Sequence, residues 1–176
     1  MKATGNPEVL YPDEGGVVTV DAGTVADLKH GALKTARRRI RLCTHPDIDD
    51  RLHEMIIIHE KGTYVRPHKH PGKSESFHVI EGEVDVVIFD ESGNVARVIP
   101  MGEYGSGRMF YYRMAEPLFH TLVIHSDVLV FHETTNGPFQ RDATVFAAWA
   151  PEEAEADKVK SFLARMNEAV SREATS

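Results

Sequence analysis

Two histidines and a glutamate stand close together in one short stretch of the chain. A single residue separates His68 from His70, and Glu75 follows five residues later. Successive side chains on a β-strand point to opposite faces, so the two imidazoles would project in the same direction. Residues 71–74 (PGKS) are typical of a turn, which would bring Glu75 onto the next strand. Two imidazoles and a carboxylate on adjacent strands form most of a divalent-metal site.

Glycines flank this stretch at regular spacing. Five residues separate Gly62 from His68, and six separate Glu75 from Gly82. The whole pattern resembles the first motif of the cupins, which are β-barrel proteins with a bound metal. For His-X-His alone, a polar strand edge is the alternative interpretation, but the full pattern favours metal binding.

The cupin resemblance implies a fourth ligand, a histidine from a second motif downstream. His120 is our candidate, in segment 117–123 (PLFHTLV), although the usual glycine and asparagine of that motif are missing. His125, near the end of the same expected strand, and His132 are competing candidates. We favour His120 because a ligand must occupy a strand position that closes the site opposite His68 and His70.

Three histidines and one carboxylate leave one or two coordination positions open. We expect one divalent transition metal, and Fe, Mn, Zn, Ni and Co all suit this donor set. An open position lets the metal polarise a substrate oxygen, or activate water or dioxygen. A metal that only stabilises the barrel is the structural alternative, although structural sites are usually closed.

The elements around these residues are predicted to be strands. β-branched and aromatic runs bounded by turn residues recur along the middle of the chain. They cover residues 54–60, 63–70, 76–80, 83–90, 95–100, 109–114, 118–125, 128–133 and 144–149. Many short strands at this spacing predict an all-β barrel or sandwich, and the cupin resemblance implies the jelly-roll form.

A helix is expected on each side of the strands. Thr24 and Asp27 fit a capping box that opens a short helix over residues 24–37. An apolar stripe at helical spacing predicts a C-terminal helix over residues 151–172. We therefore expect a single domain over residues 1–176. It comprises an N-terminal extension and helix (1–40), a barrel (41–150) and a C-terminal helix (151–172).

Composition limits the classes of function. The chain has 176 residues and a net charge of −7, which argues against a nucleic-acid partner. Cys43 is the single cysteine, so we expect neither a disulfide framework nor a thiolate zinc cluster. We see no signal-peptide core and no apolar run long enough to cross a bilayer, and therefore expect a cytoplasmic protein with no membrane partner. Small barrels with exposed edge strands often pair, so we expect a homodimer.

A closer resemblance extends over residues 24–153. Six segments carry it, in this order: 39–46 (RIRLCTHP), 64–71 (YVRPHKHP), 89–93 (FDESG), 119–121 (FHT), 133–139 (ETTNGPF) and 149–153 (WAPEE). Together they resemble the WbuC family of cupin-fold metalloproteins, which is often encoded among genes for O-antigen or other surface-polysaccharide synthesis. Phe119, where the family usually has tryptophan, and Cys43 depart from its pattern. The resemblance implies that Arg41, His45 and Glu133 are pocket residues, and we take them as the catalytic candidates.

Three functions are compatible with this pattern. The first is a metalloenzyme that isomerises or epimerises a carbohydrate substrate, a sugar or sugar nucleotide. Glu133, in phase with Phe131 on its expected strand, would move the proton. The second is an Fe(II)-dependent dioxygenase of a small molecule. The third is a non-catalytic module that binds or senses carbohydrate, so whether the protein is an enzyme stays open at this point.

Overall fold

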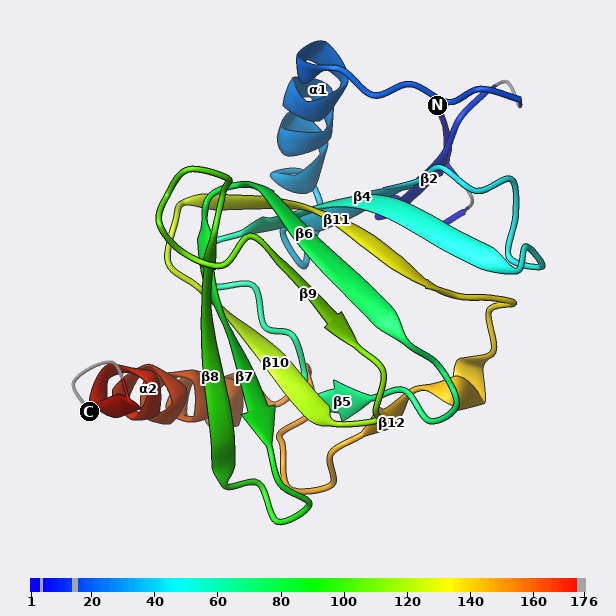
Figure 1. The fold of residues 1–176 in the computed structure, drawn as a ribbon. Helices are drawn as coiled ribbons and strands as arrows, with labels where there is room; N and C mark the ends of the chain where they lie inside the picture. The colour runs from blue at the N-terminus through cyan, green and yellow to red at the C-terminus, as the bar shows by residue number, and fades with distance from the viewer. Residues whose placement is uncertain (4, 14–15, 174–176) are drawn as a thin grey trace.

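The structure is a computed structural model that describes residues 1–3, 5–13 and 16–173, and β-strands dominate it (Figure 1). The helices among these residues are α1 (Ala22–Ala32) and α2 (Ala156–Glu173), and a 3-10 turn covers Arg141–Ala143. The strands are β1 (Lys2–Ala3), β2 (Val9–Tyr11), β3 (Arg39–Cys43), β4 (Leu52–Glu60), β5 (His68–Lys69), β6 (Glu75–Glu81), β7 (Glu83–Phe89), β8 (Val95–Gly102), β9 (Tyr111–Met114), β10 (Phe119–Ile124), β11 (Val128–Asn136) and β12 (Val145–Phe146).

The strands form two sheets. The first has the order β1-β2-β3-β4-β11-β6-β9, and the second has the order β12-β5-β10-β7-β8. Strands β4 to β11 thus contribute β4-β11-β6-β9 to one layer and β5-β10-β7-β8 to the other, which is the strand order of a double-sheet jelly roll. This order confirms the predicted cupin-type fold. Among the described residues, no strand pairing joins the two sheets, so they form an open sandwich rather than a closed barrel.

Several predicted strands are shorter than expected. Residues 63–70 were predicted as one strand, but only His68–Lys69 pairs, and residues 144–149 pair only at Val145–Phe146. Pro67 precedes β5, and proline has no N–H to donate to a ladder. Strands β5 and β12 have two residues each, so the edge of the second sheet that they form is short.

The core lies between the two sheets. Alternate residues of β6 and β11 point inward, and Phe77 stacks on Phe131 with ring centroids 4.2 Å apart. Val84 and Val86 of β7 face them from the second sheet and are fully buried. The same alternation turns Glu75 and Glu133 to the interior, two residues away from Phe77 and Phe131 respectively.

Helix α1 covers the outer face of the first sheet (Figure 1). Leu28 and Ala32 pack there against β3 and β4. The helix begins at Ala22, before the predicted Thr24, because the Asp21 carboxylate accepts the Thr24 N–H at 2.8 Å and caps it. It ends at Ala32 rather than at residue 37.

Helix α2 covers the outer face of the second sheet. Phe162, Met166 and Val170 pack against the cluster that contains Phe89 and Phe119. The helix begins at Ala156 and not at residue 151, because residues 151–155 form a turn first. In that turn the Glu155 carboxylate accepts the Glu152 N–H at 3.0 Å.

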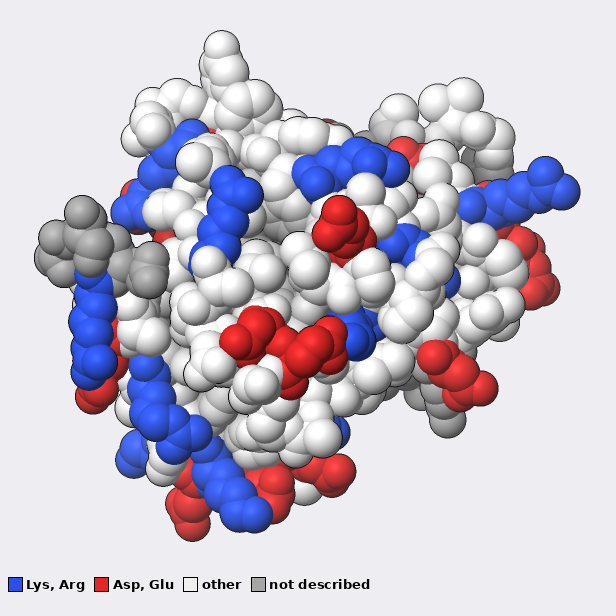
Figure 2. Space-filling view, turned by 60° about the horizontal axis from the view of Figure 1, so that its bottom comes forward, with Lys and Arg blue, Asp and Glu red and all other residues white. Residues whose placement is uncertain are grey.

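Charged side chains of both signs share the surface. Figure 2 shows Lys and Arg interspersed with Asp and Glu over the face that it displays. None of the helices in the described part of the chain is long and apolar enough to span a membrane. The predicted homodimer and cytoplasmic location stay predictions.

Candidate metal centre

Three of the predicted ligands lie together at one end of the sandwich. His68 and His70 come from the β5 segment, and His120 comes from β10, where it pairs directly with His68. One ring nitrogen from each lies within 4.8 Å of the others, so the group could hold a metal ion. The pairing of β5 with β10 brings these residues together.

Backbone carbonyls orient two of the rings. The Nδ1 of His68 lies 2.8 Å from the Arg66 carbonyl oxygen, and that of His120 lies 2.9 Å from the Leu118 carbonyl oxygen. Because a carbonyl oxygen only accepts, each Nδ1 carries the proton and donates it. The Nε2 of each ring is therefore left with its lone pair, which is the arrangement that metal-binding histidines show.

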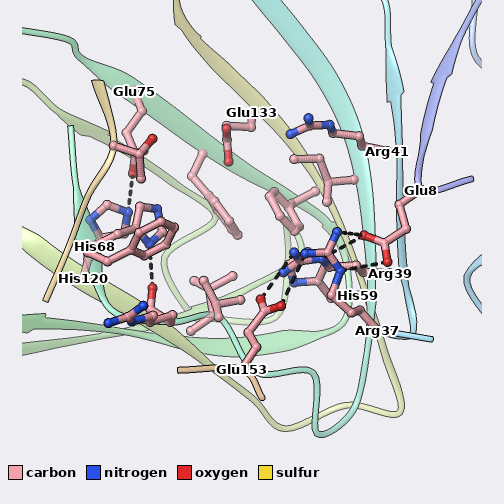
Figure 3. A pocket seen from close by; sticks show the side chains of 18 of the residues that line it. Glu8, Arg37, Arg39, Arg41, His59, His68, Glu75, His120, Glu133 and Glu153 are labelled. Atoms are coloured by element: carbon pink, nitrogen blue, oxygen red, sulfur yellow. Dashed lines mark hydrogen bonds and ion pairs between the residues drawn. The ribbon is translucent and has the colours of Figure 1, made fainter. Parts of the chain in front are cut away.

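Glu75 reaches the same point from the first sheet. Its Oε1 lies 3.3 Å from the Nε2 of His120, and its Oε2 lies 3.7 Å from the Nε2 of His70. Tyr112 on β9 donates its hydroxyl to Glu75 Oε1 at 2.8 Å, and Thr144 lies 3.3 Å from the Nδ1 of His70. All three Nε2 atoms and one carboxylate therefore converge from two sheets, as Figure 3 shows for His68, His120 and Glu75. We call His68, His70, Glu75 and His120 the ligand group.

Burial keeps two of these imidazoles neutral. It lowers the pKa of His68 well below 6.5, and the neighbouring rings of His120 and His70 lower it further. Burial also lowers the pKa of His70, against the opposing effect of the Glu75 charge. Neutral imidazole is the form that binds metal. The converging lone pairs and the donor types thus fit one divalent transition metal, without choosing among Fe, Mn, Zn, Ni and Co.

A cavity of about 630 Å³ opens from the ligand group between the two sheets. Figure 3 shows His68, His120 and Glu75 at one side of it, an arginine-rich region at the other, and Glu133 between them. Phe77, Phe131 and Leu122 supply apolar wall. The volume lies in the range of small-molecule sites, which are about 300–1,000 Å³.

Glu133 lies in this cavity, as the alternation of its strand predicted. It is two residues from Phe131 on β11 and opposite Phe77 on β6. Burial raises the pKa of its carboxyl to about 8; the nearby Glu75 charge adds to the rise and Arg41 opposes it. The cavity therefore holds, in addition to Glu75, a carboxyl whose pKa lies well above that of an exposed glutamate.

Arg41 also lines the cavity, whereas His45 does not. The His45 ring stacks on His53 with centroids 4.1 Å apart, and its Nδ1 lies 3.1 Å from the backbone oxygen of Glu54. Strand β3 ends at Cys43, so the alternation that turns Arg41 inward no longer fixes the direction of His45. The structure thus brings Arg41 and Glu133 together with the ligand group and leaves His45 outside.

The competing histidines lie elsewhere. His125 forms an ion pair with Asp85, with 2.7 Å between Nε2 and Oδ2. His132 alternates with Glu133 on β11 and so points to the other side of the sheet. Of the three candidates for the fourth ligand, only His120 faces His68 and His70.

Several cavity residues are not among the site candidates taken from the sequence. His59 and Arg39 line the cavity, and Glu8 and Glu153 lie at its arginine-rich side. Arg39 and Arg41 are two residues apart on β3, so alternation places them on one face. The pairing of Arg39 with His59 depends on β3 lying beside β4, for which we found no signal in the sequence.

Comparisons with known proteins match part of the chain to one family description. The family description that matches is a domain of unknown function, DUF6016, over residues 20–101. No curated protein matches the chain.

Three solved structures are similar to about half of this chain. An oxalate decarboxylase from Bacillus subtilis, described with Mn(II) centres, is 19% identical with a TM-score of 0.44 over 55% of this chain and 24% of that chain. The capsular polysaccharide assembling protein CapF from Staphylococcus aureus is 20% identical with a TM-score of 0.46 over 56% of this chain and 27% of that chain. Protein SO0799 from Shewanella oneidensis is 10% identical with a TM-score of 0.46 over 58% of this chain and 66% of that chain.

The chain spans about a quarter of the length of the first two of these structures. At these identities and TM-scores, the likeness says nothing about activity. The cupin-type fold rests instead on the strand order, and the candidate metal centre rests on the ligand group itself.

Proposed function

We propose that the protein is a metal-dependent enzyme of the WbuC family that isomerises or epimerises a sugar or sugar nucleotide in surface-polysaccharide synthesis. One observation carries the proposal: the ligand group opens into a cavity that is also lined by the carboxyl of Glu133, which is not a member of the group. The WbuC-like segments supply the carbohydrate part of the proposal. An open metal site beside a separate acid–base group is the usual arrangement for moving protons next to a carbonyl.

The bound metal would supply Lewis-acid polarisation of a substrate carbonyl or hydroxyl oxygen. The chain positions its ligands through groups that do not touch the metal. The carbonyls of Arg66 and Leu118 fix two imidazoles, and Tyr112 holds the Glu75 carboxylate. Such outer partners fix ring direction and raise ligand basicity.

Glu133 is the residue that we assign to proton transfer. It lines the cavity, is not in the ligand group, and forms no ion pair within the part of the chain that the structure describes. As base, its carboxylate would take a proton from a substrate carbon beside a carbonyl. As acid, it would return that proton to the same carbon or to a neighbouring atom, which gives epimerisation or isomerisation respectively. Phe77 and Phe131 form apolar wall next to it and limit competing water.

Hydrogen exchange tests this function directly. Metal-loaded protein is incubated in D₂O with a panel of nucleotide-linked keto-deoxyhexoses, and proton NMR follows loss of the C–H signals. We expect deuterium to enter the substrate with wild type and not with Glu133→Gln. Exposed Glu103, directly after β8, gives the matched control, Glu103→Gln, which should exchange at the wild-type rate.

Two outcomes would contradict the proposal. Oxygen consumption with Fe(II) and a small-molecule substrate, in place of exchange, would identify a dioxygenase. Sugar binding with neither exchange nor turnover would identify a binding or sensing module.

A further inference from the structure

The side of the cavity away from the ligand group is lined by basic side chains (Figure 3). Arg39 and Arg41 alternate on β3 and face inward together. His59 on β4 pairs with Arg39, and is therefore the diagonal neighbour of Arg41 on the same face of the sheet. No part of the proposed proton transfer uses these residues.

Arg41 has no counter-charge in contact. Its guanidinium forms no hydrogen bond or ion pair with the described residues, and its Nε is buried and unpaired. Glu133 attracts it from a distance, but no ion pair joins the two. The half-buried guanidinium lines the cavity, so an anion bound there would give it the partner that the described residues do not supply.

His59 adds a second unpaired group. Its side chain is 7% exposed, and its Nδ1 is buried without a hydrogen-bond partner. Burial, with a smaller contribution from the Arg39 charge, lowers its pKa to about 3, so the ring is neutral and can donate one N–H. The unpaired donors of Arg41 and His59 therefore lie on one wall.

The other arginines of the cavity are already paired. Arg37 and Arg39 both contact Glu8 and Glu153, and Arg66 contacts Glu152. The closest of these pairs joins Arg37 to Glu8 at 2.5 Å. Arg41 therefore differs from these arginines, because it forms no ion pair with any described residue.

We infer that Arg41, with His59 beside it, binds an anionic group of the substrate, a phosphate or a carboxylate. The planar guanidinium suits both groups because it can donate two parallel hydrogen bonds to their oxygens. The sugar part would extend towards Glu133 and the ligand group, and this half of the inference rests on the proposed function. The substrate class becomes a sugar phosphate, sugar nucleotide or sugar acid, and neutral sugars are disfavoured.

Calorimetric titration of the metal-loaded protein tests the inference. The probes are glucose 6-phosphate, glucuronate and glucose, which share a ring and differ in the anionic group. We expect one or both anionic probes to bind, more weakly as salt is added, and glucose to bind at least about tenfold more weakly. The better of the two anionic probes identifies the group.

Variants locate the contact. Arg41→Gln should raise the Kd of the anionic probe by about 10–100-fold, the usual effect of losing a charged hydrogen bond. Arg97 is exposed on β8, so Arg97→Gln makes the same charge change and should leave the Kd unchanged. His59→Gln should weaken binding less than Arg41→Gln does. Arg41→Lys serves if Arg41→Gln does not fold, and should also weaken binding because the two-pronged contact is lost.

Three results would overturn the inference: glucose binding as tightly as the anionic probes, no binding of either anionic probe, or an unchanged Kd in folded Arg41 variants. Elemental analysis of the same samples separates this from the proposed function. Anion binding that requires Arg41, in a protein without metal, would refute the proposed enzyme alone. If Arg41→Gln changes neither metal binding nor hydrogen exchange, the anion site alone is refuted.

Discussion

Replacing His59 by glutamine should make the protein less sensitive to acid. The folded-state pKa of His59 is about 3, whereas an unfolded imidazole has a pKa of about 6.5. Between these values the unfolded state binds the proton and the folded state does not, so stability rises with pH and falls as pH drops below about 6.5. The cost to folding from this one group is about 0.2 kcal/mol at pH 7 and about 2 kcal/mol at pH 5.

Urea unfolding at pH 7 and pH 5 measures this difference. Other histidines with lowered pKa values also destabilise the wild type in acid, so the useful quantity is wild type compared with His59→Gln. The variant should lose about 2 kcal/mol less than the wild type between the two pH values. His30 is exposed on α1, and His30→Gln should behave as the wild type does. Equal losses in wild type and His59→Gln would refute the argument that His59 is buried as a neutral ring beside Arg39.

Two further predictions concern the ligand group and Glu133. Tyr112→Phe removes the 2.8 Å hydrogen bond to Glu75 and should weaken metal affinity by about 10–100-fold. Competition with a chelator measures the affinity. A variant with wild-type affinity would show that this hydrogen bond does not support Glu75 as a ligand. Glu133→Gln should keep the metal and lower kcat by about 10²–10⁴-fold in the exchange assay, because the side chain can no longer take a proton. A Glu133→Gln variant with wild-type kcat would move the acid–base role to another residue.

Local patterns in the sequence predicted the part of the site that neighbouring residues build. His68 and His70 share a face because strands alternate, and the turn that follows returns Glu75 to them. His120 could be predicted because its motif begins at a turn next to a strand. These relations need only short stretches of chain and the known geometry of a strand.

Long-range pairing explains what was missed. His59 is the last but one residue of an apolar strand, and it becomes a cavity residue only because β3 lies beside β4. His45 was expected in the pocket, but the strand ends two residues earlier and the ring stacks on His53 instead. Helix α1 starts early for a local reason, because the Asp21 carboxylate accepts the Thr24 N–H and makes Asp21 the N-cap.

Metal content of the purified protein tests the central claim most directly. Elemental analysis of wild type and His120→Ala, with His30→Ala as the exposed control, requires no knowledge of the substrate. We predict about one divalent transition metal per chain in wild type and His30→Ala, and little or none in His120→Ala. Wild type that binds no transition metal, or His120→Ala that retains it fully, would contradict the account.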